Sequence, residues 1–600
     1  MHRAILGPIA YVAAAHAGRQ LDRFQRLCRT CVETQYQRLM QILRNGSDSE
    51  FGRRHHFDRV RSYRDFTAAM PLAQYAYFSP YIDRCQMGEV GALLGPSQRL
   101  VMFALTSGTT GPYKAIPVTR QFIAAYRWGW NVWGIKVIQD YQSPLIRKVL
   151  QISSPAEEKR TPSGIPCGSI SGMLARNQKR IVRRLYATPY EVTDIADPDL
   201  RNYAIMRLAV PQDIGLIVTA NPSTLVALAQ TAEGKAESLI RDVRDGTLER
   251  ILDLPMAIQS ALRCCLRPDP DGARRLECLL DRHGSLLPRH YWDSSLLGHW
   301  TGGTVGLYLS QVRRYYGDGP IRDIGLLASE GRMSLPLEDY TAAGVLDITS
   351  MFFEFVPEEQ INNLNLTPDA PTLPQDLTAL RAEQLDVGGR YYIFLTNGAG
   401  LYRYHIGDVV RMTGWMDSTP VIEFLSKGVH TSSLTGEKLT EHQVVAALNA
   451  AFHQVGLEPI SFVMAPVWGD PPHYRLFVET LTPPLQALQQ ALAQCVESNL
   501  MAGNGEYASR RRSRRLNPLQ VCFVRDGELS RHDRQLILDR RGRSEQFKHR
   551  FLINDPIREG EPGSRFTPMV CELARVSKES EQERIRSSSS YVGPLQGEST

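Results

Sequence analysis

The segment that most constrains the fold is a loop rich in glycine and hydroxyl groups at residues 106–114 (TSGTTGPYK). A short apolar run, 99–105, leads into it, and a helix-like stretch follows from Thr119. The order strand, glycine loop, helix is typical of phosphate binding, because Gly108 and Gly111 allow sharp turns that bring N–H groups near a polyphosphate. The positive end of the following helix would face the same ligand. A plain Ser/Thr/Gly turn is the less favoured alternative.

The loop is not a Walker A loop, whose motif is GxxxxGK[ST], because Lys114 comes three residues after Gly111 and is followed by Ala115. Its hydroxyls add donors without bulk, and the lysine supplies positive charge. The residues of this segment that we expect to contact a polyphosphate are Thr106, Ser107, Gly108, Thr109, Thr110, Gly111 and Lys114.

Short apolar runs alternate with helix-like segments after the loop, which predicts an α/β architecture. The strand-like runs are 149–152, 214–219, 324–327, 352–356, 391–395 and 421–424. A smaller unit follows, with helices at 441–455 and 484–498 and strands at 461–465, 474–480 and 520–524.

The chain has 600 residues, which is too long for one hydrophobic core. We predict a large N-terminal domain with mixed β-sheets and flanking helices at residues 1–425. A small, mobile α+β domain would follow at 426–555, and a polar, disordered tail at 556–600.

The composition is that of a soluble globular protein, with 43% hydrophobic and 22% charged residues. The net charge of +6 is mild for this length and does not by itself indicate nucleic acid binding. The basic runs 179–184 and 510–515 lack the interleaved aromatic residues of RNA-binding surfaces, so solvated helix faces are favoured. No apolar run is long enough to span a bilayer. We expect neither a nucleic acid nor a membrane partner.

The ten cysteines follow no disulfide framework, and Cys28 and Cys31 form a lone CxxC. Reduced thiols in a cytoplasmic protein are the favoured interpretation. Residues 4–17 resemble the apolar part of a signal peptide. However, Arg3 is the only charged side chain before them, and Pro8 interrupts the apolar run. We therefore interpret this segment as an N-terminal helix.

Further motifs follow the loop in a fixed order. They are LLASEG at 326–331, LYRYHIGDVVRMTG at 401–414, SKGVHTSSLTGEKLTE at 426–441 and GRSEQFKHR at 542–550. The loop resembles that of the adenylate-forming superfamily of acyl-CoA synthetases, peptide-synthetase adenylation domains and luciferases. The set resembles the Gretchen Hagen, or auxin-responsive promoter, family of acyl acid amido synthetases, and its bacterial more than its plant members. The resemblance covers about residues 20–555.

This resemblance implies a two-step reaction that uses ATP and Mg²⁺. A small carboxylic acid attacks the α-phosphate of ATP and gives acyl-AMP and pyrophosphate. An amine, usually that of an amino acid, then takes the acyl group and releases AMP. The resemblance also implies that the small domain rotates between the two steps.

The family's site residues fall on matching positions. The loop, with Lys114, would hold the β- and γ-phosphates. Glu330, preceded by Ser329, would ligate Mg²⁺. Asp408, four residues after Tyr404, would accept hydrogen bonds from the ribose hydroxyls, and Lys548 would reach the α-phosphate during catalysis. The structural alternatives are a solvated loop carboxylate for Glu330, a turn aspartate for Asp408, and a solvated basic patch with Arg543, His549 and Arg550 for Lys548.

The acid pocket is less defined. Tyr126, Trp130 and Trp133 recur at helical spacing after the loop and form an aromatic face. Such a stripe is usually core, but its position makes it a candidate wall for an aromatic or hydrophobic acid. Arg127 is a possible partner for the carboxylate.

The chain departs from the family at four positions, one of which is Ser426, which precedes Lys427 where plant members often have an arginine. Leu326 stands where a tyrosine usually stacks on adenine, so Phe352 or Phe353 would have to take that role, and Ala328 replaces a serine. His405 replaces an arginine, which removes a permanent charge near the nucleotide.

Two alternatives stay open. The acyl acceptor could be a thiol such as coenzyme A, or the chain could be a non-catalytic relative that binds nucleotide. The presence of Lys114, Glu330, Asp408 and Lys548 argues against the second alternative.

Overall fold

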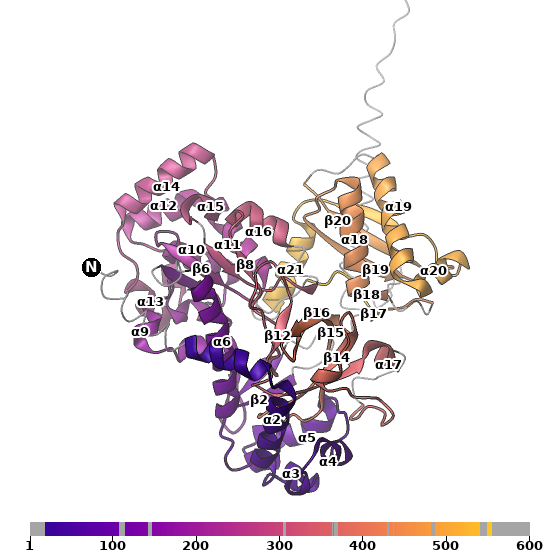
Figure 1. Ribbon diagram of the computed structural model, residues 1–600. Helices are drawn as coiled ribbons and strands as arrows, with labels where there is room; N and C mark the ends of the chain where they lie inside the picture. The colour runs from indigo at the N-terminus through magenta and orange to yellow at the C-terminus, as the bar shows by residue number, and fades with distance from the viewer. Residues whose placement is uncertain are drawn as a thin grey trace, which may run out of the picture. The chain divides into compact units, whose positions relative to one another are not determined.

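The computed structural model describes residues 18–106, 114–141, 147–293, 295–303, 308–362, 364, 370–428, 431–435, 437, 439–481, 486–539 and 549–554. The fold is mixed α/β, as the sequence predicts (Figure 1). Contacts divide the chain into a first unit that ends at Leu425 and a second that begins at Ser426. The predicted N-terminal helix at 4–17 and the predicted tail lie outside the described residues.

Short amphipathic helices open the first unit. They are α2 (Cys31–Gly46), α3 (Glu50–Arg54), α4 (Tyr63–Ala69) and α5 (Tyr75–Gln86). Ser49 and Ser62 cap α3 and α4 by accepting backbone N–H groups, which satisfies donors that a helix start leaves free. Leu39, Ile42 and Leu43 bury one face of α2.

The predicted loop joins two strands rather than a strand and a helix. β1 (Leu100–Thr106) pairs antiparallel with β2 (Lys114–Thr119), and α6 (Arg120–Asp140) begins only after β2. The expectation that a helix N-terminus faces the loop is therefore wrong. Thr119 ends β2 and caps α6 by accepting the N–H of Phe122. The four-stranded sheet has the order β2-β1-β5-β4, with β4 (Lys159–Arg160) and β5 (Pro166–Gly168), so β2 is an edge strand.

A parallel sheet follows in the order β3-β6-β7-β8, with strands β3 (Lys148–Gln151), β6 (Ile214–Val218), β7 (Leu296–Gly298) and β8 (Ile321–Arg322). Its strands are short and apolar, as expected for a sheet covered on both faces. Helix α8 (Ile170–Arg176) packs in the same core as β1 and α6. The helices around the parallel sheet are α9 (Arg180–Arg183), α10 (Pro198–Ala209), α11 (Pro222–Gly234), α12 (Ala236–Asp245), α13 (Met256–Arg263), α14 (Pro270–His283), α15 (Pro288–Tyr291) and α16 (Leu309–Tyr316) (Figure 1).

A six-stranded sheet completes the first unit in the order β11-β12-β16-β15-β14-β13. Its strands are β11 (Ser334–Leu335), β12 (Gly344–Leu346), β13 (Phe352–Pro357), β14 (Arg390–Thr396), β15 (Tyr404–Met416) and β16 (Thr419–Lys427); α17 (Glu358–Asn362) follows β13. A small hairpin, β9 (Leu327–Ala328) and β10 (Gly331–Arg332), precedes this sheet. The predicted strand at 324–327 is wrong for its first three residues, because Gly325 turns the chain at φ +90°.

The second unit is α+β. Its strands β19 (Ser461–Val467), β20 (His473–Glu479) and β21 (Gln520–Val524) form one sheet, and β17 (Thr431–Ser432) pairs with β18 (Leu439–Thr440). Its helices are α18 (Glu441–Val455), α19 (Gln486–Gly503), α20 (Gly505–Arg512) and α21 (Glu528–Asp539). Thr440 and Gln443 form a capping box at the start of α18, and Gly456 ends it in the left-handed conformation.

Candidate active site

The two ends of the predicted phosphate loop lie side by side. Thr106, the last residue of β1, is the ladder partner of Lys114, the first residue of β2. The five residues predicted between them to contact the nucleotide, Ser107, Gly108, Thr109, Thr110 and Gly111, lie outside the described residues. The pairing fixes where the loop leaves the sheet and where it returns.

Tyr75, the first residue of α5, contacts the exit of this loop. Its hydroxyl accepts the N–H of Ala115 at 3.0 Å and donates to the carbonyl oxygen of Ala115 at 3.3 Å. The ammonium of Lys114 lies 5.5 Å from the centre of the Tyr75 ring, which is within cation–π range. Burial raises the pKa of Tyr75 to about 12, so its hydroxyl stays protonated.

Glu330 sits at the tip of the β9–β10 hairpin, where Ser329 and Glu330 form the turn. Its side chain is buried, and its Oε1 accepts a hydrogen bond of 3.4 Å from the hydroxyl of Tyr404. The side-chain amide of Asn397 donates to the backbone carbonyl of Glu330 at 2.9 Å. Ser329 is half-buried.

Tyr404 joins the remaining groups. Its pKa is raised well above the usual value, first by burial and then by electrostatic interactions with Glu330, Tyr75 and Asp408. These electrostatic interactions require the four side chains to lie near one another. The structure therefore brings Lys114, Glu330, Tyr404 and Asp408 into one region of the first unit.

Asp408 lies inside strand β15 and not in a turn, so the turn alternative is wrong. Tyr392 of β14 pairs with Val409, but Phe394, two residues further, pairs with His405. An unbroken ladder would pair Phe394 with Gly407, so β15 carries two extra residues at this point. Such a bulge redirects side chains and is frequent next to active sites. Gly407 has a φ of +82°, and Asp408 is 3% exposed.

Arg403 anchors the chain just before β15. Its guanidinium binds both carboxylate oxygens of Glu354 at 2.8–3.0 Å and donates to the carbonyl of Met70 at 2.8 Å. Tyr63 donates to the same carboxylate at 2.8 Å. These contacts connect the start of β15 to β13 and to the N-terminal helices, and so hold Tyr404 in place.

The positions that depart from the family also have defined surroundings. His405 stacks on Phe394, with ring centres 4.9 Å apart. Leu326 is half-buried, and its N–H donates to the hydroxyl of Ser334. Phe352 and Phe353 are 3% and 0% exposed within the core. The expectation that one of them stacks on adenine is therefore wrong, because neither ring has an open face.

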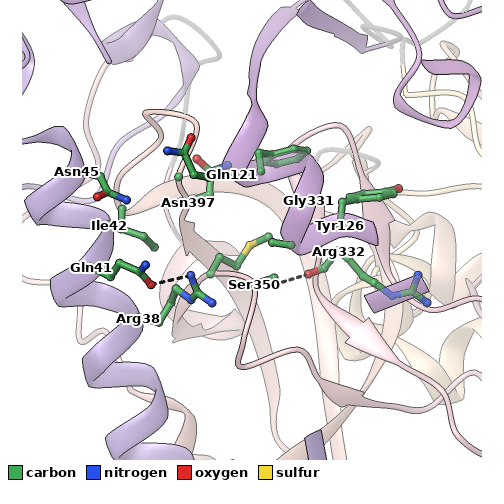
Figure 2. A pocket seen from close by; sticks show the side chains of 14 residues that line it. Arg38, Gln41, Ile42, Asn45, Gln121, Tyr126, Gly331, Arg332, Ser350 and Asn397 are labelled. Atoms are coloured by element: carbon green, nitrogen blue, oxygen red, sulfur yellow. Dashed lines mark hydrogen bonds between the residues drawn. The ribbon is translucent and has the colours of Figure 1, made fainter. Parts of the chain in front are cut away.

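A cavity of about 50 Å³ lies next to Glu330, between α2, α6 and the β9–β10 hairpin (Figure 2). Its apolar wall includes Ile42, Phe122 and Met351, and polar groups such as Arg38 and Asn45 line its α2 side. Arg38 donates to Gln41 at 3.1 Å in Figure 2. Burial lowers the pKa of Arg38, so partial desolvation opposes its charge.

The aromatic face of α6 divides between cavity and core. Tyr126 lines the cavity, whereas Trp133 is 2% exposed and packs in the core. Trp130 is half-buried and lies under the guanidinium of Arg332 at 4.6 Å. Arg127 is exposed and is not among the residues that line the cavity, and its role as a partner of the carboxylate stays a prediction.

Arg332 is a polar residue of this region that the sequence analysis missed. It lines the cavity, is fully buried, and donates from Nη2 to the carbonyl of Ile324 at 2.6 Å. Burial lowers the pKa of Arg332 to about 10, against the opposing effects of Tyr126 and Asp347. Its place directly after Glu330 and Gly331 is the one sequence signal that could have marked it.

Lys548 lies outside the described residues, but His549 after it is described in the second unit. One ring nitrogen of His549 is 2.7 Å from the carboxylate of Asp533, and the other is 2.8 Å from the carbonyl of Phe462. Burial alone would lower the pKa of His549, but Asp533 outweighs it and raises the pKa to about 9. His549 is buried, so its assignment to a solvated basic patch is wrong.

Among the described residues, no group of three or more histidine, cysteine or acidic side chains could hold a metal ion. A Mg²⁺ site at Glu330 does not need such a group. In nucleotide sites Mg²⁺ is commonly held by one or two carboxylates, and phosphate oxygens and water supply the other ligands. In the part of the chain that is described, no helix has the length and apolarity to cross a bilayer.

The fold is that of an acyl acid amido synthetase. It matches the solved structure of the GH3.15 acyl acid amido synthetase with a TM-score of 0.78 and 18% identity, over 93% of this chain and 95% of that one. A second structure of that enzyme, in complex with 2,4-DB, also has a TM-score of 0.78, with 16% identity over 94% and 96% of the two chains.

The sequence matches give the family. The GH3 family N-terminal domain matches residues 20–321, the central domain 344–427 and the C-terminal domain 442–557. This chain belongs to the GH3 family. It is 25% identical to the jasmonoyl–L-amino acid synthetase JAR6 of Nicotiana attenuata, over 84% of this chain and 88% of that protein. It is 24% identical to the indole-3-acetic acid-amido synthetase GH3.10 of Arabidopsis thaliana, over 77% and 81%.

Proposed function

We propose that this chain is an ATP-dependent acyl acid amido synthetase that converts a small carboxylic acid into its acyl-AMP and transfers the acyl group to an amino acid. The observation that carries the proposal is the run of contacts from the loop exit to the sheet. Tyr75 contacts Lys114 and Ala115, and Tyr404 contacts Glu330 and interacts with Asp408. The relatives named as jasmonoyl- and indole-3-acetic acid-amido synthetases support the same activity.

In the first step, a carboxylate oxygen of the acid attacks the α-phosphorus of ATP. The new P–O bond forms as the bond to the β-phosphate breaks, and pyrophosphate leaves. The reaction needs positive charge and hydrogen-bond donors around the phosphates, since positioning and electrostatics supply most of the catalysis in phosphate chemistry. We assign this role to the loop residues 107–111 and to the ammonium of Lys114.

The acidic residues have separate roles in this proposal. Asp408, held in the bulge of β15, accepts hydrogen bonds from the ribose hydroxyls. Glu330, with Tyr404 donating to it, holds Mg²⁺. When bound, the ion neutralises charge on the phosphates.

We place the acid in the cavity beside Glu330. Its apolar wall, which includes Tyr126 from α6, would contact the apolar part of the acid, and the cavity of about 50 Å³ would have to widen to admit an aromatic ring. The arginines of its lining, Arg38 and Arg332, supply positive charge that favours an anionic ligand.

In the second step, the nitrogen of the amine attacks the acyl carbon, AMP leaves with the electron pair of the acyl–oxygen bond, and the nitrogen loses a proton. The small domain would bring Lys548 to the α-phosphate for the first step and move away for the second. We propose the cytoplasm as the compartment, which agrees with cysteines that follow no disulfide framework in the sequence.

The test is pyrophosphate release with a library of carboxylic acids. Lys114→Ala should lower the rate by about 100-fold to 1,000-fold, the usual cost of losing one group that stabilises transition-state charge. Asp408→Ala should raise the KM for ATP. Lys235→Ala is the matched control, because Lys235 also lies over a tyrosine ring, that of Tyr203 at 5.0 Å, in the helical region around the parallel sheet.

AMP release with amino acids, other amines and coenzyme A as acceptors then identifies the second substrate. AMP release only with coenzyme A would show that the acyl acceptor is a thiol and not an amine. If no acid in the library leads to pyrophosphate release, the proposed adenylation activity is refuted.

A further inference from the structure

Strand β2 carries the residues that leave the predicted phosphate loop, and it is an edge strand. An edge strand leaves alternate N–H and C=O groups without a ladder partner. Such groups cost free energy when they are buried and unpaired. Ala115 is buried, and its outward backbone groups therefore need another partner.

Tyr75 supplies that partner from a segment 40 residues upstream. A phenol hydroxyl can donate one hydrogen bond and accept another, and the hydroxyl of Tyr75 does both with Ala115, at 3.3 and 3.0 Å. One side chain thus satisfies both backbone groups of the residue that follows Lys114. This contact fixes the end of β2 at the point where the loop returns to the sheet.

The ring of Tyr75 makes the second contact. The ammonium of Lys114 lies 5.5 Å from the ring centre, so the ring attracts the cation and limits its positions. Tyr75 is also close enough to Glu330 and Tyr404 to interact with them electrostatically. The same side chain therefore contacts the phosphate-loop exit and adjoins the acidic part of the site.

We infer that Tyr75 is a positioning residue for adenylation, whose hydroxyl holds the loop exit at Ala115 and whose ring limits the positions of the Lys114 ammonium. The inference rests on the proposed function. Tyr75 acts through Lys114 and the loop, so its loss weakens ATP use and leaves binding of the acid unchanged.

Two variants separate the two contacts. Tyr75→Phe keeps the ring under the ammonium and removes both hydrogen bonds, and we expect kcat/KM for ATP to fall about tenfold, with the KM for the acid unchanged. Tyr75→Leu removes both contacts, and the fall should reach about 100-fold. Tyr77→Phe is the matched control, because Tyr77 lies on the same helix and its hydroxyl contacts His55.

A double-mutant cycle distinguishes positioning from general support of the fold. If Tyr75 acts through Lys114, Tyr75→Leu in a Lys114→Ala background should cost at most about threefold more than Lys114→Ala alone. If the role of Tyr75 is purely structural, Tyr75→Leu should lower the melting temperature. Its loss of activity should then multiply with that of Lys114→Ala in the double variant. ATP affinity, measured by calorimetry on the full chain, gives a readout that needs no acid substrate.

Tyr75→Phe within twofold of the wild type, or effects that multiply fully in the cycle, would overturn the inference. A wild-type chain that binds ATP but activates no acid would overturn the proposed function instead. In that case calorimetry still decides the role of Tyr75: weaker ATP binding by Tyr75→Phe than by the wild type supports the inference, and equal binding overturns it.

Discussion

Replacing Glu354 with glutamine should destabilise the first unit strongly, because it leaves the guanidinium of Arg403 buried without its counter-ion. The side chains of Arg403 and Glu354 are 8% and 1% exposed, and the carboxylate receives three contacts from the guanidinium and one from Tyr63. Removing one partner of a buried ion pair typically costs about 3–5 kcal/mol, since the remaining charge stays out of water. We expect the loss of free energy of unfolding caused by Glu354→Gln to lie in that range.

The same sheet offers a matched control. Arg411 of β15 pairs with Glu423 of β16 at 2.6 Å, with side chains 49% and 24% exposed. Solvent screens this pair, so Glu423→Gln should cost at most about 1 kcal/mol. The two substitutions change the same atoms in the same sheet and differ mainly in burial.

Urea denaturation followed by tryptophan fluorescence measures the difference. All tryptophans of the chain except Trp468 lie in the first unit, so the signal reports chiefly on that unit. The double variant Glu354→Gln/Arg403→Met removes the unpaired charge and should be more stable than Glu354→Gln alone by at least about 1 kcal/mol. If Glu354→Gln proves no more destabilising than Glu423→Gln, the buried pair does not hold the start of β15.

Three further outcomes are expected. In α6, Gly129→Ala should destabilise by about 1–3 kcal/mol in urea, because its Cβ would lie 2.6 Å from a neighbouring arginine carbon; Gly134→Ala, with open space around it, should stabilise by about 0.5–1 kcal/mol. The pKa of His549 is raised to about 9, so protonated His549 stabilises the folded second unit. This contribution to the free energy of unfolding, about 3 kcal/mol, is fully present below pH 6.5 and is lost as the pH rises through 9. Hydrogen exchange of β19 measures this dependence of stability on pH, and Asp533→Asn should abolish it. If the variant shows the same pH profile as the wild type, the role of His549 is refuted. Burial raises the pKa of the Cys28 thiol to about 12, so mass spectrometry should find it unalkylated at pH 8 until the chain unfolds, and labelling of the folded chain would contradict this.

Much of the fold could be predicted because local signals and tertiary structure agree. Helix α18 has the predicted bounds, since a capping residue at Thr440 and a glycine at 456 mark both ends. Strand β2 was missed because it is short and contains Pro117, which lowers the strand signal. Proline is tolerated in β2 because this strand is at the edge of its sheet.

The site was less predictable, because its geometry depends on contacts between distant segments. The motif around Asp408 resembles a turn, and only the pairing with β14 shows that it lies in a bulge. Tyr75 and Arg332 belong to no motif, and their roles depend on neighbours that the sequence does not place beside them. The roles of residues 107–111 and of Lys548 stay predictions.

The pairing of Thr106 with Lys114 has a consequence for how such a site can change during evolution. The seven residues between them begin and end at neighbouring points of one ladder. Lengthening or rewriting a loop between fixed ends costs little free energy. Related chains could therefore exchange this segment for others of different size and polarity while the lysine and the acidic groups keep their positions, so that selectivity for the triphosphate can diverge independently of the scaffold.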